Sequence, residues 1–199
     1  MRPKDPDPIT RKKLLDAAEQ LMLQKGFVAT SVDEICSGAG VTKGSFFHYF
    51  ETKEALGKAA LERFAQCQEG RFSAKCAPVK DPLERVYALI DCAITACRDP
   101  STKGCLAGTF AQEISQTHPG LRKCCEQIFE RFSDGVTRDL VAAKKLYAPQ
   151  ADFDAKGLGG FVLALLQGSL LVVKTTGDRK QMEKNILHLR NYLEALYGK

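Results

Sequence analysis

The chain has 199 residues, of which 44% are hydrophobic and 27% charged, and its formal net charge is +5. This is the composition of a soluble globular protein of one or two domains, large enough to bury a core without metals or crosslinks. The polar, proline-rich residues 1–8 argue against a secretory signal, and the longest apolar run, Phe161 to Val173, is shorter than the roughly 20 residues of a membrane span. We therefore expect a cytoplasmic protein with no membrane partner.

The charge and the cysteine content exclude few further classes of function. Residues 1–55 hold eight Lys and Arg against eight Asp and Glu, so any attraction to phosphate must come from where the cations lie. The eight cysteines include no CxxC pair, and no His pair with zinc-ligand spacing follows them. We expect reduced thiols, no structural zinc and no cofactor.

Helical periodicity begins near the N-terminus. A first helix is predicted from about Thr10 to Lys25, where Gly26 stops it. Ser31 and Glu34 have the spacing of a capping box, which predicts a second helix starting there. Glycines at 38 and 40 end this helix after two turns.

The later helices follow from caps and breaks. Thr42 is the predicted N-cap of a third short helix that ends near Phe50, and Thr52 caps a fourth. Further helices are predicted from Asp81-Pro82, from about Leu106 to Ser115, from about Leu121, from about Asp152 to Thr175, and after Gly177. The last helix carries an apolar stripe at Met182, Ile186, Leu189, Leu193 and Leu196. No strand pattern or internal repeat is present in the sequence.

The second and third helices have the proportions of a helix-turn-helix, and the short third helix suits a major groove about 12 Å wide. The predicted DNA contacts are Thr30, Ser31, Thr42, Lys43, Gly44, Ser45, His48, Tyr49 and Lys53. Lys43 and Ser45 lie where recognition helices touch base edges, and Gly44 allows close approach. The residues at 30, 31, 48, 49 and 53 suit phosphates on either flank. Phe46 and Phe50 are expected in the core.

The residues from Thr30 to Leu56, TSVDEIC, then AGVTKGSFFHYF, then KEAL, resemble the TetR family of repressors. The resemblance covers about residues 9–60 and implies that the recognition helix, Thr30 and the flank contacts carry over. Two positions depart from the family pattern. Cys36 stands where Ala is usual, and Phe47 stands where Tyr is usual, so a phosphate contact from that hydroxyl is absent.

The resemblance also implies the architecture. We expect an all-α protein of about nine helices, with a helix-turn-helix DNA-binding domain at 1–56 and an effector-sensing and dimerisation domain at 57–199. TetR-like proteins are homodimers that pair through their last two helices. Such a dimer would place two recognition helices roughly 34 Å apart on a palindromic operator of double-stranded DNA. Repression relieved by a small-molecule effector is the family default.

The sequence says less about the effector. Aromatic residues that are expected either to line an apolar cavity or to serve as ordinary core are Phe64, Phe72, Phe110, Phe129, Phe132 and Phe161. The segment from Gly104 to Gly108 resembles one branch of the family, in which some members respond to electrophiles or oxidants. Cys105 follows Lys103 and is predicted at a helix start, features that lower a thiol pKa; the alternative is a buried, inert cysteine.

The sequence alone leaves competing functions open. The glycines at 157, 159 and 160 are no dinucleotide fingerprint because no strand precedes them, and no other catalytic motif is present, so we predict no enzyme activity. One alternative is a thiol-based sensor acting through Cys105. Another is a helical adaptor that does not bind DNA.

Overall fold

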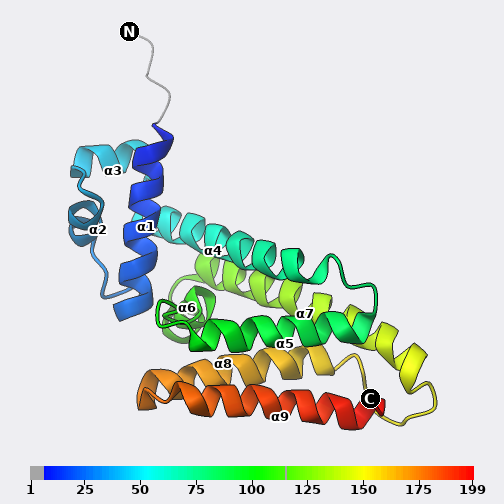
Figure 1. Ribbon diagram of the computed structural model, residues 1–199. Helices are drawn as coiled ribbons and strands as arrows, with labels where there is room; N and C mark the ends of the chain where they lie inside the picture. The colour runs from blue at the N-terminus through cyan, green and yellow to red at the C-terminus, as the bar shows by residue number, and fades with distance from the viewer. Residues whose placement is uncertain (1–6, 115) are drawn as a thin grey trace. The chain divides into compact units, whose positions relative to one another are not determined.

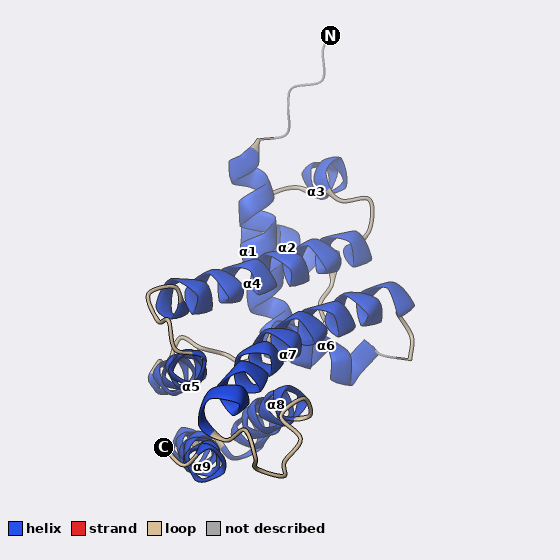
Figure 2. Cartoon of the chain, turned by 90° about the vertical axis from the view of Figure 1, so that its right-hand side faces the viewer, coloured by secondary structure: helices blue, strands red, loops and turns tan. Residues whose placement is uncertain are grey.

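The computed structural model describes residues 7–114 and 116–199, and these residues form only helices and loops (Figure 2). In chain order the helices are α1 (Pro8–Lys25), α2 (Val32–Ala39), α3 (Lys43–Tyr49), α4 (Lys53–Cys76), α5 (Pro82–Arg98), α6 (Leu106–Ile114), α7 (Pro119–Tyr147), α8 (Leu158–Thr176) and α9 (Arg179–Tyr197) (Figure 1). The predicted all-α fold of nine helices is confirmed over the described residues.

The chain divides into two compact units. Unit 1 comprises Met1–Gln66 and Gly104–Glu126, and unit 2 comprises Cys67–Lys103 and Gln127–Lys199. Unit 1 therefore contains α1, α2, α3 and α6, together with the first parts of α4 and α7. The division into domains at 1–56 and 57–199 stays a prediction. It assigned α6 to the second domain, whereas α6 packs into the N-terminal unit.

Most helix ends lie where the sequence placed them, and the starts of three helices differ. Helix α7 begins at Pro119, two residues before the predicted Leu121. The carboxylate of Asp7 accepts a hydrogen bond from the backbone N–H of Ile9, so α1 begins two residues before the predicted start. The predicted start of α8 at Asp152 was wrong. The carboxylate of Asp154 accepts from the N–H groups of Lys156 and Gly157, and this turn delays α8 to Leu158. The predicted end of α6 at Ser115 lies outside the described residues.

The core of unit 1 forms where α1, α2, α3, α6 and the first part of α4 bring their apolar sides together. Its fully buried members include Leu14, Met22, Phe27, Ile35, Phe46, Leu56, Leu61, Leu106 and Phe110. The rings of Phe27 and Phe110 lie 5.3 Å apart, between the α1–α2 loop and α6. A Cβ at Gly57 would lie 2.9 Å from the Phe27 ring, so α4 approaches this pair as closely as a glycine allows.

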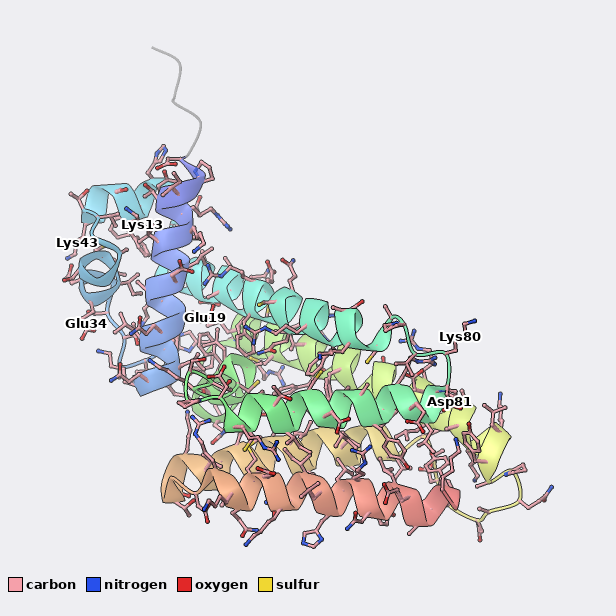
Figure 3. The ribbon with its side chains drawn as sticks, viewed as in Figure 1. Lys13, Glu19, Glu34, Lys43, Lys80 and Asp81 are labelled. Carbon is pink, nitrogen blue, oxygen red and sulfur yellow. The ribbon has the colours of Figure 1, made fainter. Side chains whose placement is uncertain are left out.

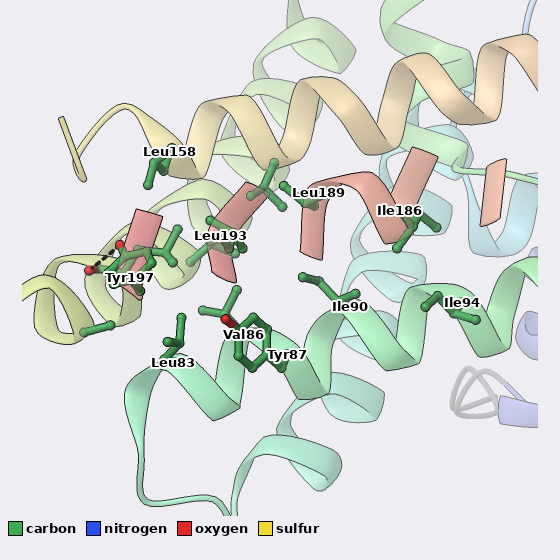
Figure 4. Close-up of a cluster of buried hydrophobic side chains, with 14 of the residues drawn as sticks. Leu83, Val86, Tyr87, Ile90, Ile94, Leu158, Ile186, Leu189, Leu193 and Tyr197 are labelled. Atoms are coloured by element: carbon green, nitrogen blue, oxygen red, sulfur yellow. Dashed lines mark hydrogen bonds between the residues drawn. The ribbon is translucent and has the colours of Figure 1, made fainter. Parts of the chain in front are cut away.

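Unit 2 has its own core, built between α5, α7, α8 and α9. Figure 4 shows Leu83, Val86 and Ile90 of α5 facing Leu189 and Leu193 of α9. The apolar stripe of the last helix, which the resemblance suggested for pairing with a second copy, is instead buried within the chain at four of its five positions, so most of that face belongs to the core of unit 2. The Tyr197 hydroxyl donates to the carbonyl of Leu140 at 2.9 Å, and burial raises the pKa of Tyr197 to about 12.

Candidate nucleic-acid interface

The turn between α2 and α3 aims the second helix. Gly40 ends α2 in the left-handed conformation, at φ +65°, where its N–H bonds back to the carbonyls of Cys36 and Ser37. Thr42 then caps α3, because its hydroxyl accepts a hydrogen bond from the Ser45 N–H at 3.2 Å. A left-handed glycine followed by a side-chain cap changes the chain direction within three residues.

The two sides of α3 differ in chemistry. Phe46 is fully buried and Phe50 is 5% exposed, so this side joins the core as the sequence predicted. Lys43, Gly44 and His48 are exposed on the other side. Seven residues make a helix of about 10 Å, which is short enough to enter the major groove.

Further positions on the exposed side of α3 fit the predicted contacts. A Cβ built at Gly44 would have only the Thr42 hydroxyl within 4 Å, at 3.8 Å, so the backbone there is open to close approach. Ser45 and Tyr49 are half-buried, and Phe47 is 55% exposed. The Phe47 ring lies edge-on to the ring of Phe46 at 5.2 Å.

Ser31 and Glu34 form the predicted capping box at the start of α2. The Ser31 hydroxyl accepts from the Glu34 N–H at 3.2 Å, and the Glu34 carboxylate accepts from the Ser31 N–H at 2.9 Å. Lys25 also pairs with Glu34. The hydrogen bond from Lys25, with those from Ser31, lowers the pKa of Glu34 to about 2. The α2 N-terminus thus holds a permanent carboxylate close to Ser31.

Thr30 and Lys53, predicted as phosphate contacts, lie beneath this surface. Thr30 is fully buried and its hydroxyl donates to the Gly26 carbonyl at 2.6 Å. The Lys53 ammonium donates to the carbonyls of Phe27 and Thr30, each at 2.9 Å, and of Val28 at 3.3 Å. An ammonium has three hydrogens, so these carbonyls occupy all of them. A phosphate contact from either residue would require it to leave its partners.

Lys53 also lies over an aromatic face. Its Nζ is 4.4 Å from the centre of the Phe27 ring, a distance typical of a cation–π contact. Partial burial lowers the pKa of Lys53, with Glu113 opposing that shift. Lys53 therefore holds the α1–α2 loop by its carbonyls and by the face of Phe27.

Glu113 of α6, which sequence reasoning missed, holds the same loop by its N–H groups. Its carboxylate accepts from the backbone of Phe27 at 2.6 Å and of Val28 at 2.9 Å. Gly26 makes room for it: φ is +88°, and a Cβ there would lie 2.6 Å from a Glu113 carboxylate oxygen. No local pattern could have revealed a partner 86 residues away in the chain.

Cys105 lies at the N-cap position of α6. Its carbonyl accepts from the Thr109 N–H at 2.9 Å, and its Sγ accepts from the Gly108 N–H at 3.4 Å. The Cys105 side chain is half-exposed, whereas Cys124 and Cys125 are buried. Burial, with the nearby thiols of Cys124 and Cys105, raises the pKa of Cys125 to about 12.

The aromatic residues predicted for an effector site do not gather in one place. Phe64 and Phe110 belong to the buried core of unit 1. The others lie in unit 2, where Phe72, Phe129 and Phe132 are half-buried and Phe161 is 44% exposed. The rings of Phe72 and Phe132 come together, with their centres 6.2 Å apart. The Phe161 ring lies 5.5 Å from the ring of Tyr192 on α9, and both side chains are largely open to solvent. Within the described residues, no group of three or more His, Cys, Asp and Glu side chains could hold a metal ion.

Comparison with known proteins gives matches along most of the chain. Residues 14–60 match the model described as "Bacterial regulatory proteins, tetR family", and residues 82–189 match "Tetracyclin repressor-like, C-terminal domain". The chain is 32% identical over 186 residues to the HTH-type transcriptional repressor NemR of Escherichia coli (strain K12), covering 92% of this chain and 94% of NemR. It is 27% identical to the HTH-type transcriptional repressor DhaR of Mycobacterium sp. (strain GP1), covering 87% of each.

Solved structures have the same fold. The reduced form of Escherichia coli NemR superposes with a TM-score of 0.80 at 26% identity, over 92% of this chain and 95% of NemR. A TetR family regulator from Agrobacterium tumefaciens superposes with a TM-score of 0.83 at 20% identity, over 94% of this chain and 97% of that one.

Proposed function

The chain belongs to the TetR family of bacterial regulatory proteins and is a DNA-binding transcriptional regulator, and from this premise we propose that it represses transcription from a palindromic operator until an effector releases it. The observation that carries the proposal is the exposed side of α3. Lys43, Gly44 and Ser45 lie at its N-terminal end, and Phe46 anchors the opposite side in the core. Recognition helices contact base edges from this end.

Loss of the Lys43 ammonium tests this assignment. Duplexes selected by the wild-type protein from a random-sequence library supply the probe, and their shuffled versions supply the reference. Lys43→Ala should weaken binding of the homodimer to the selected duplex by about 30-fold or more, because one specific base contact is lost in each half-site. Lys145→Ala, which removes an exposed lysine from α7, is the matched control. Equal affinity of the two variants for the selected duplex would contradict the proposal.

The second element of the proposal is a homodimer through α8 and α9. Large apolar side chains are exposed on these helices at Phe161, Leu171, Val172, Leu187 and Tyr192. Helix α8 is long and apolar enough to cross a membrane, yet only 22% of its apolar stretch is buried within the chain. A second copy that packs against this face would bury it and supply the two recognition helices that a palindrome requires. With this apolar face buried in a dimer, the protein would be cytoplasmic.

A membrane-bound state is the competing explanation for the apolar face of α8. Sedimentation of the purified protein without detergent separates the two. A dimer at micromolar concentration supports the proposal, whereas a protein that stays in solution only with detergent or vesicles contradicts it.

The effector is proposed to act on unit 1 through α6. Cys105 lies at the N-cap position of this helix and Glu113 near its end, where Glu113 holds the α1–α2 loop. A reversible apolar ligand remains the main proposal. The position of Cys105 favours a second candidate, in which modification of the thiol removes the sulfur from the Gly108 N–H and disturbs the start of the helix.

Alkylation with N-ethylmaleimide distinguishes the two effectors. If Cys105 is the sensor, the reagent should release the selected duplex from the wild-type protein and leave the Cys105→Ser variant bound. Release of DNA from both proteins by an unreactive apolar compound would support the ligand and contradict the thiol mechanism.

A further inference from the structure

Asp33 places a carboxylate on the surface that is proposed to meet DNA. It lies in the first turn of α2, and its Oδ1 is 2.7 Å from the Nζ of Lys43, the first residue of α3. Both side chains are open to solvent, at 68% and 59% exposure. The ion pair therefore joins the N-terminal turns of the two helices of the motif, and Figure 3 shows Lys43 between α3 and α2.

The neighbouring acid Glu34 has other hydrogen-bond and ion-pair partners. It closes the capping box with Ser31 and pairs with Lys25, away from α3. Asp33 takes no part in the cap, and its ion-pair partner among the described residues is Lys43. An exposed carboxylate repels the phosphates of any DNA, so its presence there opposes binding unless it improves the contact that Lys43 makes.

The geometry allows such an improvement. The Lys43 ammonium has three hydrogens, and Asp33 takes one of them. The two that remain suit the O6 and N7 acceptors of a guanine, which a lysine can contact together. The hydrogen bond from Lys43 to Asp33 also raises the pKa of Lys43 above its ordinary value. A lysine without this partner has a flexible stem that can turn toward the nearest phosphate instead.

We propose that Asp33 is a specificity-determining residue, which orients Lys43 toward a base edge and opposes binding through phosphates alone. The inference rests on the proposed function, since it requires that α3 lies in the major groove with Lys43 against the base edges. Asp33 then lowers affinity for random DNA more than for the operator. A neutral residue at this position would raise general affinity and reduce discrimination.

The Asp33→Asn variant tests this with the full-length protein, the selected duplex and its shuffled version. We expect affinity for the shuffled duplex to rise and the ratio of the two affinities to fall by about threefold to tenfold, part of the discrimination of one base contact. The salt dependence of shuffled-duplex binding should steepen by about 1.8 in log–log slope, as for one additional phosphate contact from each subunit of the dimer. Asp134→Asn, which removes an exposed acid from α7, should change neither quantity.

The variant in a Lys43→Ala background completes the test. If Asp33 acts through Lys43, adding Asp33→Asn to Lys43→Ala should leave the affinity ratio unchanged. An unchanged or higher ratio in the single variant, or an equal fall in both backgrounds, would overturn the inference. A wild-type protein that does not distinguish the two duplexes would instead contradict the proposed function itself. Thermal unfolding of each variant identifies a merely structural loss, which would weaken both duplexes equally.

Discussion

Two helix pairs in this molecule are built by the same local rules and present opposite surfaces. Helices α2 and α3 are joined through Gly40 at φ +65° and a cap at Thr42, and α8 and α9 through Gly177 at φ +71° and a cap at Asp178. The first pair buries its apolar side and leaves mainly polar groups outside. The second leaves an apolar face outside. Turn chemistry thus sets the shape of each pair, and the exposed surface sets the kind of partner.

The largest expected effect comes from breaking the apolar face. Leu171 is 45% exposed on α8, so Leu171→Arg should leave unit 2 folded and prevent a second copy from packing there. Loss of the dimer separates the two recognition helices and should weaken binding to the selected duplex by about 100-fold or more.

Sedimentation and DNA titration of the same sample check this prediction. Leu146→Arg is the matched control, because Leu146 is 62% exposed on α7. A Leu171→Arg protein that remains dimeric and binds DNA normally would show that α8 meets no second copy at this position.

The next effect concerns the support of the DNA-reading helices. Gly26→Ala puts a Cβ where φ is +88° and where a Glu113 oxygen would be 2.6 Å away. The strained backbone and the displaced carboxylate should together lower the free energy of unfolding by about 2–4 kcal/mol. Gly135→Ala should lower it by nothing, or raise it by up to about 1 kcal/mol, because Gly135 lies within α7 with open space at its Cβ position.

Urea unfolding measures both variants. The Glu113→Ala change added to Gly26→Ala relieves the collision and leaves the strained backbone. If the double variant is no less stable than the Glu113→Ala protein, the left-handed conformation of Gly26 contributes nothing.

The helix-turn-helix and the loop before it show why some contacts of the site could be predicted from the sequence and others could not. The capping box of Ser31 and Glu34 and the Thr42 cap involve residues three apart, so local sequence is enough to identify them. Glu113 contacts a loop 86 residues earlier, and only the folded chain reveals that pairing. Thr30 and Lys53 were assigned to phosphates from their positions beside the short helices and from a resemblance. Neither shows where a buried hydroxyl or ammonium finds acceptors.

Substitution of the two caps would sharpen the comparison between the helix pairs. Thr42→Ala and Asp178→Ala each remove the side chain that accepts from a backbone N–H at the start of a helix. Each should lower the free energy of unfolding by about 1 kcal/mol. Only Thr42→Ala should also weaken binding to the selected duplex, since α3 carries the base contacts. Equal losses of DNA affinity would mean that the cap positions no recognition surface.

The smallest expected effect is the pH dependence carried by Glu34. Its pKa falls from an ordinary 4.5 to about 2, mainly through the hydrogen bond from Lys25, so the contribution to stability is present above pH 4.5 and is lost as the pH falls through about 2. In Glu34→Gln the free energy of unfolding should therefore change less between those two values. The effect is small because solvent screens this exposed pair. Lys25→Met should flatten the same pH range by removing the first cause of the shift. A Lys25→Met protein with the wild-type pH profile would assign the shift to the capping box alone, and α2 would then owe its acid stability entirely to contacts within its own first turn.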